Sequence, residues 1–137
     1  MNIENKERWT RWQRNVIDEY KPLSVEEIRE DLRSKAHPFS TLMEHWKGDF
    51  NVATMIRNAN AFNCSEVFYL GRKHIDKRGT VGTHHYVELQ HLDNYNDLLS
   101  LKERYTFVAL DNNVDNCVSM NSFEWPPNSL MIFGEEG

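Results

Sequence analysis

Cysteine, glycine and long apolar runs are all scarce in this sequence of 137 residues. With only Cys64 and Cys117, the chain lacks the multiple bridges of a small secreted domain, and a reducing compartment is expected. No window approaches the roughly 18 apolar residues of a membrane span. The first residues also lack the apolar core of a signal peptide. We therefore expect a soluble, cytoplasmic protein that does not contact a membrane.

Positive charge is not in excess either. The chain has 16 Lys and Arg against 21 Asp and Glu, a formal net charge of −5. Overall charge therefore does not indicate a nucleic-acid partner, and a polyanion would need a local basic patch. The glycine-rich loops GxGxxG and GxxxxGK[ST] are absent, which weighs against an ordinary α/β nucleotide-binding domain. A 39% hydrophobic content with 12% aromatic residues indicates one folded domain with a core.

The first region, residues 1–37, is expected to be a helical N-terminal extension. Ser24 and Glu27 have the spacing of a capping box, which predicts a helix running through Lys35. An earlier helix, ended by Pro22, is predicted from an apolar stripe of helical spacing. That stripe consists of Trp9, Trp12, Val16, Ile17 and Tyr20.

The second region, residues 38–137, alternates between strand and helix patterns. Strands are expected at 40–44, 66–70, 86–92, 106–110 and 129–133, with helices at 51–62 and 95–104. Such alternation is typical of βαβ units, so we predict an α/β fold with a mostly parallel, Rossmann-like sheet and flanking helices. In these sheets ligands lie at the carboxyl ends of the strands. The apolar strand 130–133 lies at the end of the chain, and we expect a longer natural domain or a partner covering it.

The helix predicted at 51–62 is the most informative segment. Its apolar stripe is ordinary core packing, but Asn51 and Arg57 are polar residues with possible functions. Asn is a favoured N-cap, and a helix N-terminus attracts anions, so we expect Asn51 to cap the helix. Arg57 supplies a planar cationic fork for phosphate or ribose oxygens. The alternative for Arg57 is a surface ion pair.

Two motifs together resemble the SpoU (TrmH) family of RNA methyltransferases, in the SPOUT superfamily. In the first, Asn51 is followed six residues later by Arg57, then by Ala61-Phe62 and the strand 67–70. In the second, the apolar strand 130–133 runs into Gly134-Glu135-Glu136-Gly137. A loop of small residues at 80–83 also looks like that of the family. The resemblance covers about residue 39 to the end.

The resemblance implies transfer of a methyl group from S-adenosylmethionine to a ribose 2′-hydroxyl of tRNA or rRNA. It also implies an α/β domain with a C-terminal trefoil knot and a homodimer. The family's third motif is missing here, which predicts a chain without the knot segment and with an incomplete cofactor site. By this comparison Asn51, Arg57 and Glu136 are the catalytic candidates, and Leu110, Gly134 and Glu135 the cofactor-binding ones.

A guanidinium keeps its proton at ordinary pH, so we expect Arg57 to orient the ribose and neutralise a phosphate. Glu136 could orient Arg57 across the site, and its alternative is a charged tail. A basic loop after the strand 66–70 is the candidate RNA contact, through phosphates. It contributes Arg72, Lys73, Lys77 and Arg78. The alternative is a solvated loop, just as Trp9 and Trp12 could stack on bases or belong to the core.

A metal site and a cysteine nucleophile are both disfavoured. Adjacent histidines in a strand point to opposite faces, so His84 and His85 would be poor joint ligands. Neither CxxC nor HExxH accompanies them, His91 or the more distant Cys64. No base is paired with either cysteine. The competing function is an RNA-binding or dimerisation module of the same fold that has no catalytic activity.

Overall fold

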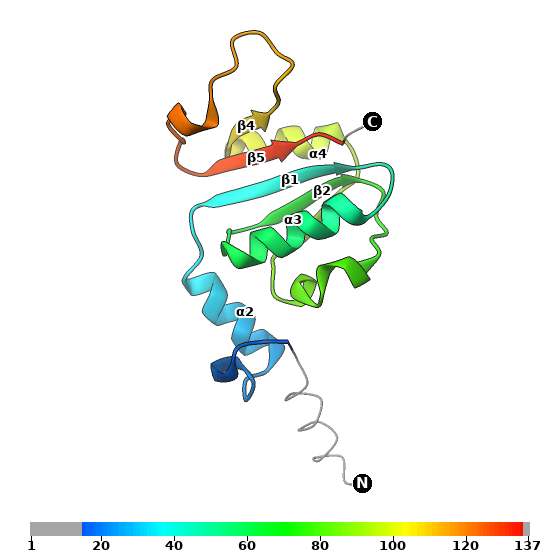
Figure 1. Cartoon of the computed structure of the whole chain (residues 1–137), viewed down its shortest axis with the longest axis vertical. Helices are drawn as coiled ribbons and strands as arrows, with labels where there is room; N and C mark the ends of the chain where they lie inside the picture. The colour runs from blue at the N-terminus through cyan, green and yellow to red at the C-terminus, as the bar shows by residue number, and fades with distance from the viewer. Residues whose placement is uncertain (1–14, 136–137) are drawn as a thin grey trace.

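Five parallel strands form a single sheet in the computed structural model of the protein, which describes residues 15–135. The order across the sheet is β3-β2-β1-β5-β4, with the strands running towards the right in Figure 1. Their bounds are β1 Phe39–His45, β2 Val67–Gly71, β3 Leu89–Leu92, β4 Thr106–Leu110 and β5 Ser129–Phe133. The parallel α/β architecture expected from the sequence is confirmed.

Side chains of β2 alternate between two apolar cores, one on each face of the sheet. Val67 and Tyr69 join the core under α3 (Phe50–Ala61), whereas Phe68 and Leu70 join the core on the opposite face. Successive residues of a strand point to opposite faces, so a strand covered on both sides is apolar throughout. This explains the continuous apolar run in β2.

Helix α3 covers β1 and β2, and no helix lies over β5 on the same face (Figure 1). On that face α3 packs through buried Val52, Met55 and Ile56. The other face is covered by the short helix α4 (Tyr95–Ser100) and the 3-10 helix η4 (Leu101–Glu103), with Leu101 buried in the second core. On the α3 face, the sheet is therefore covered by a helix on the β2 side of β1 and, in the described part of the chain, left without one on the β5 side.

The capping box at Ser24 is present as predicted. Glu27 N–H donates to Ser24 Oγ at 3.1 Å, and Ser24 N–H donates to the Glu27 carboxylate at 2.6 Å. The resulting helix is α2, Val25–Ser34. Because these contacts are local in sequence, the motif alone predicts the start of α2.

The helix predicted before Pro22 is wrong where it can be checked. Asp18–Tyr20 forms only a 3-10 turn, η1, and Ile17 is 59% exposed instead of facing a core. Trp9 and Trp12 lie outside the described residues.

Three other predictions are corrected. Asn51 does not cap α3, because the helix begins at Phe50 and Asp49 is the N-cap residue, with its carbonyl bonded to Ala53 N–H at 3.1 Å. The strand predicted at 86–92 starts only at Leu89, after two 3-10 turns, η2 (Lys77–Thr80) and η3 (Thr83–His85). The helix predicted at 95–104 ends at Ser100, where the chain tightens into η4. Ser100 Oγ donates to the carbonyl of Asp97 at 2.6 Å, and tightening into a 3-10 turn is common at helix ends.

A polar network centred on Glu66 joins the amino ends of the strands. Its carboxylate accepts hydrogen bonds from Tyr105 Oη and Arg104 Nη1, both at 2.7 Å, and from Gln90 Nε2. Glu66 N–H donates to the buried Ser40 Oγ at 3.1 Å. Burial alone raises the pKa of Glu66, but the bonds from Arg104, Tyr105 and Gln90 together hold it below its ordinary 4.5.

We predict that Glu66→Gln lowers the free energy of unfolding at neutral pH by about 1–3 kcal/mol, since a charged hydrogen-bond acceptor is lost. Because the folded-state pKa of Glu66 is depressed, its contribution is present above the unfolded-state pKa and is lost as pH falls through the folded one. Urea titrations between about pH 7 and pH 3 should show the two proteins converging in acid. Glu103→Gln, on exposed η4, is the control and should track the wild type. A Glu66→Gln deficit that is constant with pH would contradict this account.

Candidate functional site

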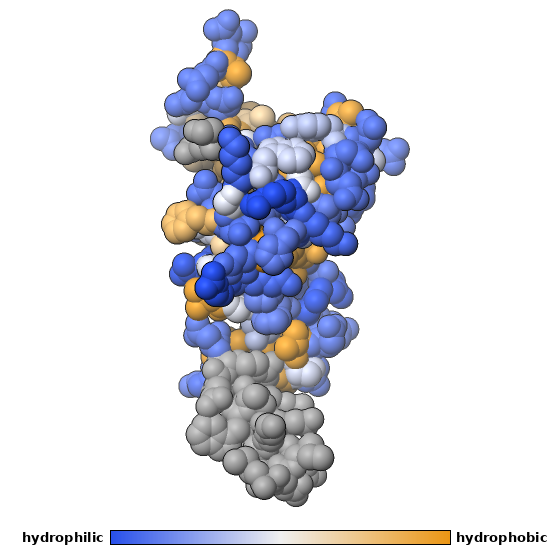
Figure 2. Space-filling model, turned by 90° about the vertical axis from the view of Figure 1, so that its right-hand side faces the viewer, coloured by the Kyte–Doolittle hydropathy of each residue, from blue (hydrophilic) through white to orange (hydrophobic). Residues whose placement is uncertain are grey.

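The strand order reverses between β1 and β5. The chain adds β2 and β3 on one side of β1, then crosses to the other side for β4 and β5. In open parallel sheets this switch point leaves a crevice beyond the carboxyl ends of the two central strands. Figure 2 looks at this edge of the sheet, where the surface is mostly hydrophilic with only small separate apolar patches.

Two grooves lie beside the switch point. The first, called here the β5 groove, has a volume of about 450 Å³ between α3 and the uncovered face of β1 and β5. The second, the edge groove, has about 280 Å³ at the carboxyl ends of β1 and β5. Asn51 and Gly134 line both grooves, and Glu135 lines the edge groove. Thus three of the residues singled out in the sequence are brought together here.

Two further residues predicted for the site are Leu110 and Glu136. Leu110, the last residue of β4, is in register with Phe133 and lines neither groove. It lies one strand further from α3 than Gly134 does. Glu136 lies outside the described residues.

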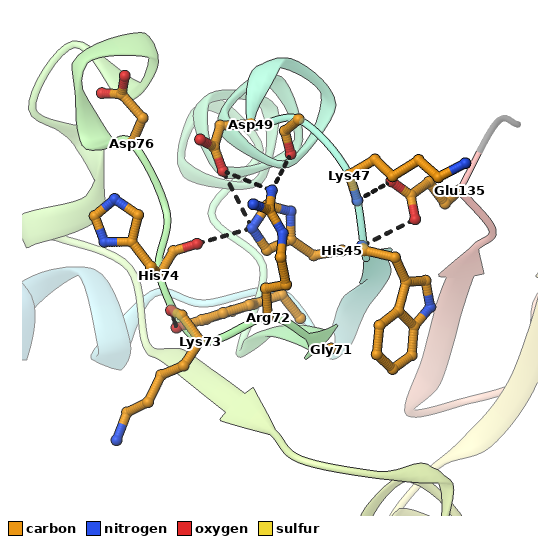
Figure 3. A network of polar contacts seen from close by, with 12 residues as sticks. His45, Lys47, Asp49, Gly71, Arg72, Lys73, His74, Asp76 and Glu135 are labelled. Atoms are coloured by element: carbon orange, nitrogen blue, oxygen red, sulfur yellow. Dashed lines mark hydrogen bonds and ion pairs between the residues drawn. The ribbon is translucent and has the colours of Figure 1, made fainter.

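Glu135 holds the turn between β1 and α3. Its carboxylate accepts hydrogen bonds from the backbone N–H groups of Trp46, at 2.9 Å, and Lys47. Trp46 lies 89 positions and Lys47 lies 88 positions before Glu135 in the sequence. The contact therefore ties the end of β5 to the entrance of α3 (Figure 3).

A second network fixes the same turn from the side of β2. His45, only 2% exposed, places Nε2 at 2.9 Å from the carbonyl of His74 and at 3.1 Å from Asp49 Oδ1. Arg72 Nη2 donates to the carbonyl of Gly48 at 3.2 Å and lies 3.6 Å from Asp49 Oδ1 (Figure 3). Together these contacts join the β1–α3 turn to the segment that follows β2.

Gly71 makes this approach possible. Its φ is +122°, and an added Cβ would stand 2.5 Å from the carbonyl oxygen of His45. Only glycine combines this φ with so close an approach of another backbone segment. The same carbonyl accepts the N–H of Arg72 at 2.8 Å.

The basic loop contains two kinds of cation. Arg72 pairs with Asp49 at the β1–α3 turn, and Arg78 forms an ion pair with Asp76, with Nη2–Oδ2 at 2.5 Å. The Arg78 guanidinium lowers the pKa of Asp76 to about 2. In contrast, Lys73 and Lys77 are exposed and make no ion pair within residues 15–135. Of the four predicted RNA contacts, these two lysines carry the uncompensated charge.

Arg57 faces away from both grooves. Arg57 is six positions after Asn51, and at 3.6 residues per turn the two side chains point about 120° apart around the helix. Arg57 instead lines a pocket of about 300 Å³ on the far side of α3, together with Tyr20, Asn60 and Tyr86. One chain therefore does not bring Arg57 and Asn51 to a common site.

His84 and His85 pack against each other, and Cys64 is buried. His84 and His85 lie on η3 with ring centroids 4.0 Å apart, so the expectation that they point to opposite faces of a strand is wrong. Burial raises the pKa of the Cys64 thiol to about 11, which leaves it a poor nucleophile. Within residues 15–135 no group of three or more His, Cys, Asp or Glu could hold a metal ion. Nor is any helix in that range long and apolar enough to span a membrane.

Sequence reasoning missed the contacts that organise this edge. His45 and Asp49 have the i, i+4 spacing of a side-chain pair, but they straddle a turn and not a helix. Glu135 reaches its partners only through the fold, and no local pattern marks it. The sequence pattern predicts a strand at Tyr86, and no local signal indicates that this residue lines a pocket with Arg57.

Comparison with known proteins relates this geometry to one family. Residues 38–137 match the SpoU rRNA Methylase family. Three solved structures share the fold. The "TrmH/SpoU tRNA modifying enzyme" of A. aeolicus is 21% identical with a TM-score of 0.66, over 83% of this chain and 62% of that one. The "SpoU Methyltransferase AviRb" of Streptomyces viridochromogenes is 15% identical with a TM-score of 0.62, over 72% and 43%.

The third structure is the "AdoMet bound rRNA methyltransferase" of Sinorhizobium meliloti, 18% identical with a TM-score of 0.59, over 77% of this chain and 44% of that one. The chain thus matches between 43% and 62% of the length of these proteins. No curated protein matches the sequence.

We predict that His45→Phe destabilises the β1–α3 turn. The substitution leaves the His74 carbonyl without its donor and removes the ring nitrogen that lies 3.1 Å from the buried Asp49 Oδ1, which should cost about 1–3 kcal/mol of unfolding free energy. Hydrogen exchange read by mass spectrometry should accelerate in 46–49 and 72–75. His37→Phe, at an exposed side chain, is the control. Unchanged exchange in those two segments would refute the role given to His45.

Proposed function

Because the chain belongs to the SpoU rRNA methylase family, we propose that it transfers a methyl group from S-adenosylmethionine to a ribose 2′-hydroxyl of tRNA or rRNA. The observation that supports this most strongly is the meeting of Asn51 with Gly134 and Glu135. These residues belong to the two motifs of the family resemblance, far apart in sequence, and they line one groove at the switch point of the sheet. Ligands of parallel sheets bind at such points.

The edge groove has donors and acceptors that fit S-adenosylmethionine. This cofactor carries a transferable methyl group on a positively charged sulfur, beside an ammonium and a carboxylate. Glu44 and Glu135 supply negative charge at the groove, and Asn51 supplies an amide that both donates and accepts. Gly134 leaves the space beside it open, since an added Cβ would meet only Glu44 Oε2, at 4.0 Å. These residues would hold the cofactor at the end of β5.

RNA would be bound on the side of Arg57 and the basic loop. Lys73 and Lys77 would contact phosphates, which gives affinity without reading sequence. Arg57 would orient the target ribose and neutralise its phosphate, and it keeps its proton while doing so. Glu136 would help to position Arg57.

A homodimer completes the proposal. Since Arg57 and Asn51 lie on different faces of α3, a second copy of the chain could bring its Arg57 to the Asn51 side of the first. The β5 groove is a suitable contact for that copy, because most of the residues that line it are apolar, among them Phe62, which is 68% exposed. The site would then be assembled from two chains.

The alternative function is an RNA-binding module of the same fold that does not transfer methyl groups. The two functions share the RNA-binding surface and differ in the cofactor.

We predict that incubation with S-adenosylmethionine and mixed tRNA and rRNA yields 2′-O-methylated nucleosides, identified by mass spectrometry after digestion. Arg57→Ala should reduce the rate by about 10²–10³-fold, as expected for loss of one group that stabilises the transition state. Lys102→Ala, on η4 across the sheet, is the control and should retain full activity. RNA binding without methylation would support the module instead, and methylation of a base would overturn the ribose assignment.

The assembly of the site from two chains can be tested by mixing two inactive variants. Asn51→Ala and Arg57→Ala should each be inactive, but a mixture of the two should recover about a quarter of the activity, because half of the dimers then contain one intact site. No recovery in a mixture shown to exchange subunits would contradict the assembly from two chains.

We also predict that Lys73→Ala and Lys77→Ala weaken RNA binding in a salt-dependent way. Each should reduce the slope of log affinity against log salt concentration by about 0.7, the contribution of one phosphate contact on a single strand. Arg78→Ala should change the slope less, because its charge is compensated by Asp76. Fluorescence anisotropy at several salt concentrations measures this. Equal slopes for Lys73→Ala, Lys77→Ala and the wild type would exclude the loop as an RNA contact.

A further inference from the structure

A pocket on the far side of α3 contains, besides Arg57, aromatic and amide side chains to which the methyl-transfer proposal gives no role. It has a volume of about 300 Å³ and lies between the segment 15–20, α2, α3 and the turn that joins η2 to η3. We call it the Arg57 pocket. Its walls come from four separate parts of the chain, so it exists only in the folded protein.

The polar side chains of this pocket are available to a ligand. Arg57 is exposed, and neither it nor Asn60 makes a side-chain hydrogen bond or ion pair within the part of the chain that the structure describes. The arginines of α2 differ in this respect. Arg29 and Arg33 both bind Glu88, at 3.1 and 2.6 Å. Arg57 is thus an uncompensated cation in a concave site, beside an amide that can donate and accept.

Two tyrosines, Tyr20 and Tyr86, belong to the wall of the pocket. Tyr20 is fixed by its hydroxyl, which donates to Asp31 Oδ2 at 2.6 Å. Tyr86 follows η3 and packs edge-on against the His85 ring, with centroids 6.3 Å apart. An aromatic face accepts any nucleobase by stacking, whatever its hydrogen-bonding edge.

The turn that carries Tyr86 is held in a strained shape. Val81 has φ +53°, in the left-handed region that β-branched residues avoid, and Gly82 follows with φ +83°. The turn is anchored by Thr80, which is fully buried and donates from Oγ1 to the Lys77 carbonyl at 2.7 Å. Thr83 Oγ1 in turn donates to the Thr80 carbonyl at 2.7 Å. Such strain persists only where the surroundings enforce it, and it concentrates at binding sites.

We propose that the Arg57 pocket holds one unstacked nucleotide of the RNA, with its base against Tyr86 and its phosphate or ribose at Arg57. The inference rests on the RNA substrate of the proposed function and adds how that RNA must be presented. A pocket of this size with aromatic side chains in its wall accepts a splayed-out base and excludes a base pair. The protein should therefore select unpaired nucleotides in loops, bulges or ends.

The test is anisotropy of a labelled single-stranded octaribonucleotide. Binding should weaken about 5- to 100-fold in Tyr86→Ala, the range measured when one base loses its stacking partner. Tyr86→Phe should bind as the wild type does, because the ring remains. Trp125→Ala removes an exposed aromatic ring from the loop between β4 and β5 and should have no effect.

An octamer in which all bases are replaced by abasic ribose separates the base from the backbone. Its binding should be weak and indifferent to Tyr86→Ala. If Tyr86→Ala weakens both octamers equally, or neither, the pocket does not hold a base and the inference falls, while the RNA function stands. If the wild type binds no octamer at all, the proposed function falls with it.

Because Tyr86→Ala could lose binding through partial unfolding, a second test uses the wild-type protein alone. Uridine and adenosine 5′-monophosphate should shift the backbone amide resonances of Arg57, Asn60 and Thr83, whereas inorganic phosphate should leave them in place. Equal shifts with phosphate would reduce the pocket to an anion site and overturn the base contact.

Discussion

The pairing of β1 with β2 on one side and β5 on the other is the constraint on which the rest of the structure depends. The register places His45 beside Gly71 and Met43 beside Phe133, so three segments remote in sequence end at one edge. The close approach of Gly71 to the His45 carbonyl and the hold of Glu135 on the β1–α3 turn both follow from it. The start of α3, and with it Asn51, is thereby fixed relative to the end of β5.

Helix α3 separates two surfaces as a result. Its first turn contributes Asn51 to the grooves at the switch point, while its third turn contributes Arg57 to a pocket on the opposite side. A motif that reads as one unit in the sequence is thus divided by helical periodicity. The proposed chemistry needs both halves, which is why a second copy of the chain enters the account. Under the proposed function, one side would bind the cofactor and the other would bind RNA.

Local patterns predicted much of the fold. The strands 106–110 and 129–133 have the predicted bounds, and α2 begins at the predicted capping box, because alternation and capping depend on neighbours in sequence. The prediction that Asn51 caps α3 is wrong because the helix already begins at Phe50. The N-cap residue is Asp49, which bonds to the first turn through its backbone carbonyl and not through its side chain. The contacts that build the site were beyond sequence reasoning. Glu135 bonds to Trp46, and Tyr86 comes to line the same pocket as Arg57, only after the sheet and the η2–η3 turn have formed.

The most direct test of this division is hydrogen exchange by mass spectrometry on the whole chain, with S-adenosylmethionine and RNA added separately. The account predicts that the cofactor slows exchange in 43–51 and 130–135, at the carboxyl ends of β1 and β5. RNA should instead slow exchange in 57–60, 72–77 and 81–86. Protection of the same segments by both ligands would contradict the assignment of the two faces of α3.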